Sequence, residues 1–209
     1  LLWKSYLSSY FCLNVIYKNR YYICCPCEEY KLNFQFYYVF VYAPASEVLK
    51  SKFWQDFTIY IKSLDKPVVV IGDLNELKHP SEKMGWAQLL QHFKRLNDFI
   101  TDTSLVNLPS YGSSFTCRKK KDGDGNIFEV LDRALVSYEW IDKYPCAKTF
   151  HHPFTSSDHC PIAIEYNLNY IKKAPPFRFE IMWTKREDFE NLIQHCWQQK
   201  FTGSNLYCL

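Results

Sequence analysis

Carboxylate, amide and imidazole side chains are concentrated in three short stretches of this sequence. The stretches are Gly-Asp-Leu-Asn-Glu at residues 72–76, Leu-Asp-Arg at 131–133 and Ser-Asp-His-Cys-Pro at 157–161. Each lies beside an apolar run that is typical of a β-strand. Because a strand end is rigid and the loop after it is open, side chains from several strand ends can converge on one metal ion and one phosphate.

The residue types in these stretches suit the hydrolysis of a phosphodiester. That reaction needs a divalent cation held by hard oxygen ligands, a base for the attacking water and donors around the phosphoryl oxygens. Asp73, Asp132 and Asp158 supply carboxylates, which are such ligands. His159 can act near neutral pH as a base or as an electrostatic stabiliser.

Two further polar side chains complete the candidate set. Asn75 can donate to a phosphate oxygen or to a water, and Tyr42 presents a phenol at the end of its own apolar run. Each candidate also has an ordinary interpretation, because an Asp after a strand is more often a loop or cap residue. The neighbours Asp132 and Arg133 could likewise form a surface salt bridge. The three stretches in order, each beside a strand, predict a site more specifically than any one of them.

Apolar periodicity predicts the elements that carry these residues. Strands are predicted at residues 11–17, 20–25, 34–43, 68–71, 127–136 and 160–166. Helices are predicted at residues 46–64, 86–100 and 187–199, with a helical turn around Trp140 and a Gly-, Ser- and Lys-rich loop at 110–126. The strand at 68–71 is apolar on both faces, as in the middle of a sheet. The order of elements predicts an α+β (layered α/β) domain, a two-sheet β-sandwich flanked by helices.

Composition limits the class of protein. The content of 47% hydrophobic and 18% aromatic residues excludes a disordered chain, and 209 residues are enough for one sizeable core. The net charge of +3 permits a nucleic-acid partner without requiring one. No apolar run is long enough to span a bilayer, so we expect no membrane partner. The chain begins at Leu1 inside an apolar stretch, so we expect it to be a piece of a longer protein.

The cysteines do not indicate a site. Nine cysteines are an odd number and no secretory signal precedes them, so we expect reduced thiols and an intracellular protein. Cys24 and Cys27 have a zinc-like spacing, but no second pair follows, which favours an ordinary place in a strand. Cys160 directly follows His159, and neighbouring residues of a strand point to opposite faces. A Cys–His nucleophile is therefore not expected.

Taken as a set, the motifs resemble the endonuclease/exonuclease/phosphatase superfamily. They are Tyr-Ala-Pro at 42–44, Gly-Asp-Leu-Asn at 72–75, Leu-Asp-Arg-Ala-Leu-Val-Ser at 131–137 and Ser-Asp-His-Cys-Pro-Ile at 157–162. A narrower resemblance is to the endonuclease domain of plant non-LTR (LINE-type) retrotransposons. It rests on Phe-Thr-Cys at 115–117, followed by Leu-Asp-Arg-Ala-Leu-Val-Ser, then Trp140 and then Ser-Asp-His. The segment Pro-Phe-Arg-Phe-Glu at 176–180 resembles the connection from that domain towards a reverse transcriptase.

The resemblance implies a role for each candidate residue. Asp73 would act on the attacking water, Asn75 would orient the scissile phosphate, and Tyr42 would contact that phosphate. His159 would bond the phosphate and stabilise its developing charge, with Asp132 behind it fixing the imidazole. A carboxylate that accepts from one ring nitrogen leaves the other nitrogen aimed at substrate, which agrees with this assignment.

The resemblance also implies a metal ion, a partner and a domain organisation. Asp158 and Asp73 would hold Mg²⁺, with Mn²⁺ as the alternative ion, and the substrate would be DNA. Residues 1–170 would form the endonuclease/exonuclease/phosphatase-like domain, and residues 171–209 a linker and helix leading towards a reverse-transcriptase region. In an intact element DNA nicking would prime reverse transcription, and the nucleus is where such an enzyme would meet its target.

Two departures from the family pattern leave other functions open. The family's first strands carry an Asn and then a metal-binding Glu upstream of the point where this chain begins, and Glu28, Glu29 and Glu76 are not in a context to replace that Glu. Cys117 stands where the family usually has Trp. The alternatives are a non-catalytic retroelement remnant that at most binds nucleic acid, and a phosphatase of the same superfamily.

A run of four basic residues is a separate candidate contact with DNA. The run consists of Arg118, Lys119, Lys120 and Lys121, in the predicted loop before the Asp132 strand. Such residues can touch phosphates, with about one salt-sensitive contact for each engaged charge. A solvated flexible loop is the open alternative.

Overall fold

A computed structural model of the protein describes residues 11–30, 32–85, 93–121, 125–166, 188–191 and 194. The chain divides into two units, Leu1–Tyr170 and Ile171–Leu209, and the elements below belong to the first. The helix predicted over residues 187–199 lies largely outside the described residues, as does the first half of the helix predicted over 86–100.

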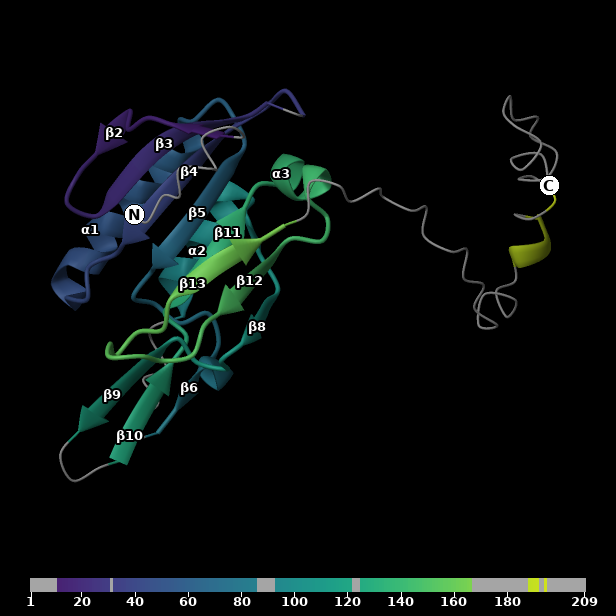
Figure 1. The fold of residues 1–209 in the computed structure, drawn as a ribbon. Helices are drawn as coiled ribbons and strands as arrows, with labels where there is room; N and C mark the ends of the chain where they lie inside the picture. The colour runs from purple at the N-terminus through teal and green to yellow at the C-terminus, as the bar shows by residue number, and fades with distance from the viewer. Residues whose placement is uncertain are drawn as a thin grey trace. The chain divides into compact units, whose positions relative to one another are not determined.

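A seven-stranded sheet forms the centre of the first unit (Figure 1). Its main path has the order β1-β3-β4-β5-β11-β7, and β2 pairs with β3 beside this path. The strands are β1 (Phe11–Leu13), β2 (Tyr17–Lys18), β3 (Tyr22–Glu29), β4 (Phe34–Tyr42), β5 (Val68–Asp73), β7 (Val106–Asn107) and β11 (Asp132–Val136). Because β4 and β5 are parallel and β11 is antiparallel to β5, the ends of β4 and β5 meet the start of β11 at one edge.

Two helices cover one face of this sheet, α1 (Glu47–Lys62) and α2 (Lys94–Thr103). Phe57 of α1 and Phe99 of α2 form a stacked pair whose ring centroids lie 5.1 Å apart, and both rings are buried in one cluster with residues of β5. Removing these large rings from water stabilises the helices on the sheet. Among the described residues, no helix combines the length and the apolar character needed to cross a membrane.

The opposite face of the central sheet packs against α3 (Tyr138–Lys143) and a second sheet. The second sheet has the order β13-β12-β8, formed by β8 (Ser110–Gly112), β12 (Lys148–His151) and β13 (Ile162–Glu165). Val69 of β5 is buried with Trp140 of α3 on this side, whereas Val68 and Val70 are buried on the helical side. The strand is therefore apolar on both faces, as its sequence predicts.

A third, small sheet lies at one end of the unit, where Figure 1 shows a hairpin of β9 and β10. Its order is β6-β10-β9, formed by β6 (Lys83–Met84), β9 (Cys117–Lys121) and β10 (Gly125–Glu129), and the 3-10 helix η2 (Pro80–Glu82) precedes it. The predicted class, a layered α+β domain with two sheets and outer helices, is confirmed, and this hairpin sheet is added to it.

The structure corrects several element predictions. Residues 110–126 contain β8 and β9 instead of a loop, because these polar strands lack the apolar alternation that indicates a strand. The predicted strand over residues 127–136 is two strands, β10 and β11, and the predicted strand over 11–17 is also two, β1 and β2. The strand β12 was not predicted. The described part of the helix predicted over 86–100 begins at Lys94 and continues to Thr103.

Candidate active site

The registers of three neighbouring strands bring predicted residues to one edge of the central sheet. Asp73, the last residue of β5, is opposite Asp132, the first residue of β11. Tyr42, the last residue of β4, is opposite Asp73 across the parallel pair. Gly72 allows this approach, since its φ is 141° and a Cβ there would lie 2.1 Å from the carbonyl oxygen of Val41. Strand register therefore places the two carboxylates side by side.

His159 reaches this edge from a separate segment of the chain. Cys117 and His159 form an antiparallel bridge, and the Cys160 amide donates to the Thr116 carbonyl at 2.8 Å. These contacts pair residues 158–160 with the start of β9. The position of the imidazole is therefore set by a backbone pairing between segments that are distant in sequence.

Thr116 joins the start of β11, which carries Asp132, to the segment that carries His159. It is fully buried, and its hydroxyl accepts hydrogen bonds from the amides of Leu131 at 2.9 Å and Asp132 at 3.0 Å. Its carbonyl holds the Cys160 amide beside His159. In the sequence Thr116 stands out only as part of a family motif, because no local pattern reveals which distant amides a threonine hydroxyl will bind.

The resulting side-chain cluster consists of Asp73, Asp132 and His159. The Nδ1 of His159 lies 2.8 Å from Oδ2 of Asp132, and one potential ligand atom from each of the three residues lies within 4.8 Å of the other two. Both carboxylates are buried, with Asp73 7% and Asp132 8% exposed. A carboxylate at Nδ1 orients the ring and turns Nε2 away from Asp132.

The Asp73 carboxyl is electrostatically perturbed. Burial, which penalises its charged form, and the nearby charge of Asp132 raise the pKa of Asp73 from 3.8 to about 6. The Asn75 amide hydrogen bond and the positive charge of His159 act in the opposite direction. A carboxyl with a pKa near 6 is mostly ionised at neutral pH and can still accept a proton during a reaction.

Asn75 lies directly against this carboxylate. Its backbone amide donates to Oδ1 of Asp73 at 2.8 Å, and its side-chain Nδ2 donates to Oδ2 of Asp73 at 3.1 Å and to the Ala43 carbonyl at 2.8 Å. Its φ of 47° lies in the left-handed region, which asparagine tolerates better than most residues. The side chain thereby joins the loops that follow β4 and β5.

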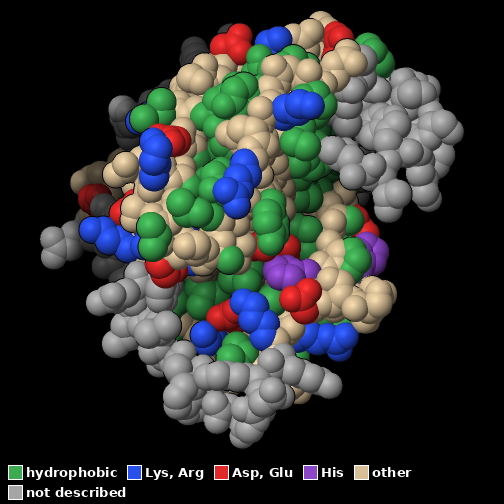
Figure 2. All heavy atoms as spheres, turned by 90° about the vertical axis from the view of Figure 1, so that its left-hand side faces the viewer, with side chains coloured by type: hydrophobic (Ala, Val, Ile, Leu, Met, Phe, Trp, Pro, Cys, Tyr) green, Lys and Arg blue, Asp and Glu red, His purple; other side chains and the backbone are tan. Residues whose placement is uncertain are grey.

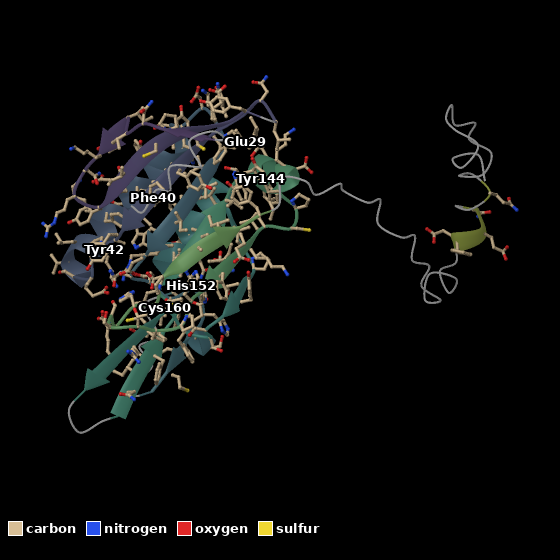
Figure 3. The ribbon with its side chains drawn as sticks, viewed as in Figure 1. Glu29, Phe40, Tyr42, Tyr144, His152 and Cys160 are labelled. Atoms are coloured by element: carbon tan, nitrogen blue, oxygen red, sulfur yellow. The ribbon has the colours of Figure 1, made fainter. Side chains whose placement is uncertain are left out.

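Tyr42 and Asp158 are less closely associated with the cluster. Tyr42 is opposite Asp73 in the backbone register, but it is 66% exposed, at the end of β4 (Figure 3). Asp158 is exposed, and among the described residues the group of potential metal ligands contains Asp73, Asp132 and His159 without it. Of the two predicted metal ligands, Asp73 belongs to this group and Asp158 does not. The role of Asp158 as a ligand stays a prediction.

Lys119 carries positive charge towards the site. Its Nζ lies 3.2 Å from Glu129, which also pairs with Lys83 at 2.9 Å. Burial opposes the charge on Lys119, but the attraction of Glu129 and Asp73 outweighs it and raises the pKa of the lysine. The same charge lowers the pKa of Asp73. Lys119 is therefore a cation close enough to influence the candidate catalytic carboxylate.

Arg118, the first residue of the basic run, contacts the protein itself. Arg118 donates from Nη2 to the Thr155 carbonyl at 3.1 Å, and its guanidinium lies over the Phe154 ring, 4.9 Å from the centroid. The side chains of Lys120 and Lys121 lie outside the described residues. The run is part of the strand β9, so the open-loop interpretation is wrong for Arg118 and Lys119.

A hollow with mixed charges adjoins the site. A cavity of about 190 Å³ borders Asn75 and Lys119. Its other charged lining residues are Glu47, Lys50, Glu76, Lys83 and Glu129. Figure 2 shows the face of the molecule on which acidic, basic and histidine side chains come close together in the lower half. The hollow is therefore lined by charges of both signs and adjoins the site at Asn75.

Glu76 has a structural environment that its sequence context did not reveal. Its side chain is completely buried and lies 3.4 Å from Lys50 of α1 and 3.2 Å from Arg95 of α2. Burial raises the pKa of Glu76, and the two cations oppose that rise. The glutamate that follows Asn75 therefore anchors the loop to both helices.

Arg133 does not form the surface salt bridge with Asp132 that was one interpretation of their adjacency. It is buried and binds Glu82 with both terminal nitrogens, at 3.1 and 2.8 Å. This paired contact joins β11 to η2 and leaves Asp132 free of a competing ion pair with its neighbour. The Asp132 carboxylate that contacts His159 is therefore not shared with Arg133.

The three cysteines considered in the sequence analysis, Cys24, Cys27 and Cys160, are buried. Burial and the charge of Asp132 raise the pKa of Cys160 to about 11, so its thiol is protonated at neutral pH and is a poor nucleophile. Cys24 and Cys27 are buried in β3. Neither observation supports a catalytic thiol or the zinc interpretation.

No family model and no curated protein matches the chain, but solved structures do. The endonuclease domain of TRAS1, a telomere-specific non-LTR retrotransposon, is 15% identical with a TM-score of 0.57, and the match covers 76% of this chain and 70% of that one. An endonuclease/exonuclease/phosphatase family protein from Leptotrichia buccalis is 10% identical with a TM-score of 0.47, covering 76% and 60%. The human Nocturnin catalytic domain is 13% identical with a TM-score of 0.35, covering 75% and 61%. The first similarity shows that the chain shares the fold of the TRAS1 domain.

Proposed function

We propose that this chain, which has the fold of the TRAS1 endonuclease domain, is a phosphodiester hydrolase of the endonuclease/exonuclease/phosphatase superfamily that nicks DNA. The observation that carries the proposal is the contact of His159 with Asp132 beside the perturbed carboxyl of Asp73. This set combines a proton acceptor with an oriented imidazole, and it lies next to a hollow lined by both lysines and glutamates.

In this proposal Asp73 is the general base. Its carboxyl group is ionised at neutral pH and can accept a proton from a water held beside it. The water oxygen forms a bond to phosphorus, its proton goes to Asp73, and the bond from phosphorus to the leaving oxygen breaks. Asn75, fixed by the Ala43 carbonyl and Asp73, orients the phosphate or the water.

His159 stabilises the charge that develops on the phosphoryl oxygens. With Nδ1 engaged by Asp132, its Nε2 can point to the substrate, and an oriented donor of this kind is effective because it needs no rearrangement during the reaction. Tyr42 adds a phenolic contact to the phosphate from the end of β4. Lys119 supplies positive charge near Asp73.

The donor chemistry fits a divalent cation, which we propose is Mg²⁺, with Mn²⁺ as the alternative. Asp73 and Asp132 repel one another, as expected of carboxylates placed to receive a cation, and carboxylate oxygens are the ligands Mg²⁺ prefers. Asp73 would hold the ion together with Asp158 or Asp132. When bound, the ion would offset negative charge on the phosphoryl group.

The proposed partner is DNA, and the proposed context is a retrotransposon polyprotein. The name of the TRAS1 domain and the motifs of this chain both support that context. Residues 171–209 would lead to a reverse transcriptase of the same polyprotein, and the nucleus would be the place of action.

Nicking of supercoiled plasmid DNA with Mg²⁺ tests the proposal. Asp73→Ala and His159→Ala are each expected to lower the nicking rate by about 10²–10⁴-fold. The matched control is Asp56→Ala, because Asp56 is an exposed carboxylate of α1 that pairs with Lys52. Folded protein that binds DNA without nicking it would point to the non-catalytic remnant. Hydrolysis of a small phosphomonoester without nicking would point to the phosphatase.

A further inference from the structure

The segment between β12 and β13 carries Asp158 and His159 over the start of β9. Figure 3 labels His152 and Cys160 near its two ends. At these ends the His152 amide donates to the Pro161 carbonyl at 2.9 Å, and the Cys160 amide donates to the Thr116 carbonyl at 2.8 Å. Between them, Arg118 of β9 binds the carbonyls of Thr155 and Asp158.

Arg118 makes three contacts with this part of the segment. Its amide donates to the Asp158 carbonyl at 2.8 Å, its Nη2 donates to the Thr155 carbonyl at 3.1 Å, and its guanidinium lies over the Phe154 ring at 4.9 Å. One arginine thus contacts residues at both ends of the stretch 154–158. The stacked ring and the hydrogen bond restrict the guanidinium to one orientation.

We infer that Arg118 is a positioning residue, which clamps residues 154–158 so that His159 stays against Asp132. The inference rests on the proposed function for its catalytic consequence. The planar guanidinium can stack and donate at the same time, whereas a lysine ammonium would lose the planar fork that makes both contacts together. One face of its guanidinium covers Phe154 and one terminal nitrogen binds Thr155, so these parts of Arg118 are already occupied by the segment.

Phe154 provides a test that does not change charge. Phe154→Leu keeps apolar bulk but removes the aromatic face, and Phe154→Tyr keeps that face. Arg118→Ala removes both side-chain contacts of the clamp and keeps the backbone hydrogen bond to Asp158. Arg20→Ala is its matched control, because Arg20 lies over the Tyr21 ring at 5.6 Å in another part of the molecule. Both arginine variants lower the net charge equally.

Hydrogen exchange of the metal-free, DNA-free protein is the first readout. Arg118→Ala and Phe154→Leu should speed exchange of the amides in residues 155–160 by roughly three- to tenfold, the size expected for loss of a cation–π contact and one exposed hydrogen bond. Phe154→Tyr and Arg20→Ala should leave that exchange near its original rate. Unchanged exchange in Arg118→Ala would overturn the positioning role, whether or not the protein nicks DNA.

Nicking kinetics give the second readout. A positioning role predicts that Arg118→Ala and Phe154→Leu lower kcat by roughly ten- to a hundredfold, since small displacements of a catalytic group have effects of this size. It also predicts an unchanged salt dependence of KM. A higher KM with unchanged kcat, and a salt slope smaller by about one, would make Arg118 a DNA contact instead. If the original protein does not nick DNA, the proposed function fails, while the exchange comparison still decides whether the clamp exists.

Discussion

Two buried carboxylates and one imidazole share a small volume at the end of β5, and their charges influence one another. Asp132 raises the pKa of Asp73, whereas His159 lowers it. The arrangement separates the tasks of the two acids, because Asp132 is committed to Nδ1 of His159 while Asp73 is bound by Asn75. At the scale of single residues, the perturbed carboxyl is the feature most open to measurement.

The pH dependence of stability should reveal the raised pKa of Asp73. Folded Asp73 binds its proton more tightly than unfolded Asp73, so the contribution of this residue to the stability of the metal-free protein should fall as pH rises from about 4 to about 6. With a pKa that changes from 3.8 to about 6, the loss is on the order of 2–3 kcal/mol. Asp73→Asn removes this titration, so its free energy of unfolding relative to the original protein should increase over the same pH range.

Urea denaturation in the presence of EDTA at several pH values between 4 and 7.5 measures this difference. Asp56→Asn, which removes an exposed carboxylate, controls for general charge effects. If the difference between Asp73→Asn and the original protein does not change with pH, Asp73 does not have a raised pKa in the folded state.

At the scale of elements, the site depends on the contact between the start of β9 and two other segments. The Thr116 hydroxyl holds the amides of Leu131 and Asp132, and its carbonyl holds the amide of Cys160. The prediction of a loop at 110–126 missed this contact, because β9 has the sequence Cys-Arg-Lys-Lys-Lys and lacks the apolar alternation that indicates a strand. In contrast, the buried strand β5 and the amphipathic helix α1 were predictable from local pattern alone.

Thr116→Val tests this junction at nearly constant volume. Valine leaves the two amides without their acceptor in a buried position, which should cost about 2–4 kcal/mol in the free energy of unfolding. Thr116→Ser retains the hydroxyl and should cost much less. Urea denaturation measures both variants, and an equal loss in the two would show that the hydroxyl contributes no more to stability than the methyl group does.

At the scale of the whole molecule, charge is nearly balanced, with a formal net charge of +3. Attraction to the proposed DNA substrate should therefore depend on where cations lie more than on their total number. Lys119 lines the hollow beside Asn75, whereas Lys62 ends α1 and lines a separate cavity with Val68, at the first residue of β5. The two lysines therefore lie near opposite ends of β5.

Salt dependence of DNA binding should distinguish these two lysines. Lys119→Gln should weaken binding and reduce the slope of log K against log salt by about one, because one phosphate contact is lost. Lys62→Gln, which removes the same charge at the other end, should leave the slope unchanged. Fluorescence anisotropy with a labelled duplex at several salt concentrations measures both, and equal slopes for both variants would exclude Lys119 as a phosphate contact.

The sequence by itself determined the residue types of the site, the central strand β5 with its two apolar faces, the helix α1 and the layered α+β class. These features follow from local periodicity and from the chemistry of single side chains. Only the tertiary structure decided that Asp132 lies opposite Asp73 and that the Thr116 hydroxyl accepts from the Asp132 amide. It also decided that His159, and not Asp158, lies with the two buried carboxylates. Strand register and contacts between distant segments are selected by the packing of the whole core, so no local stretch of sequence specifies them.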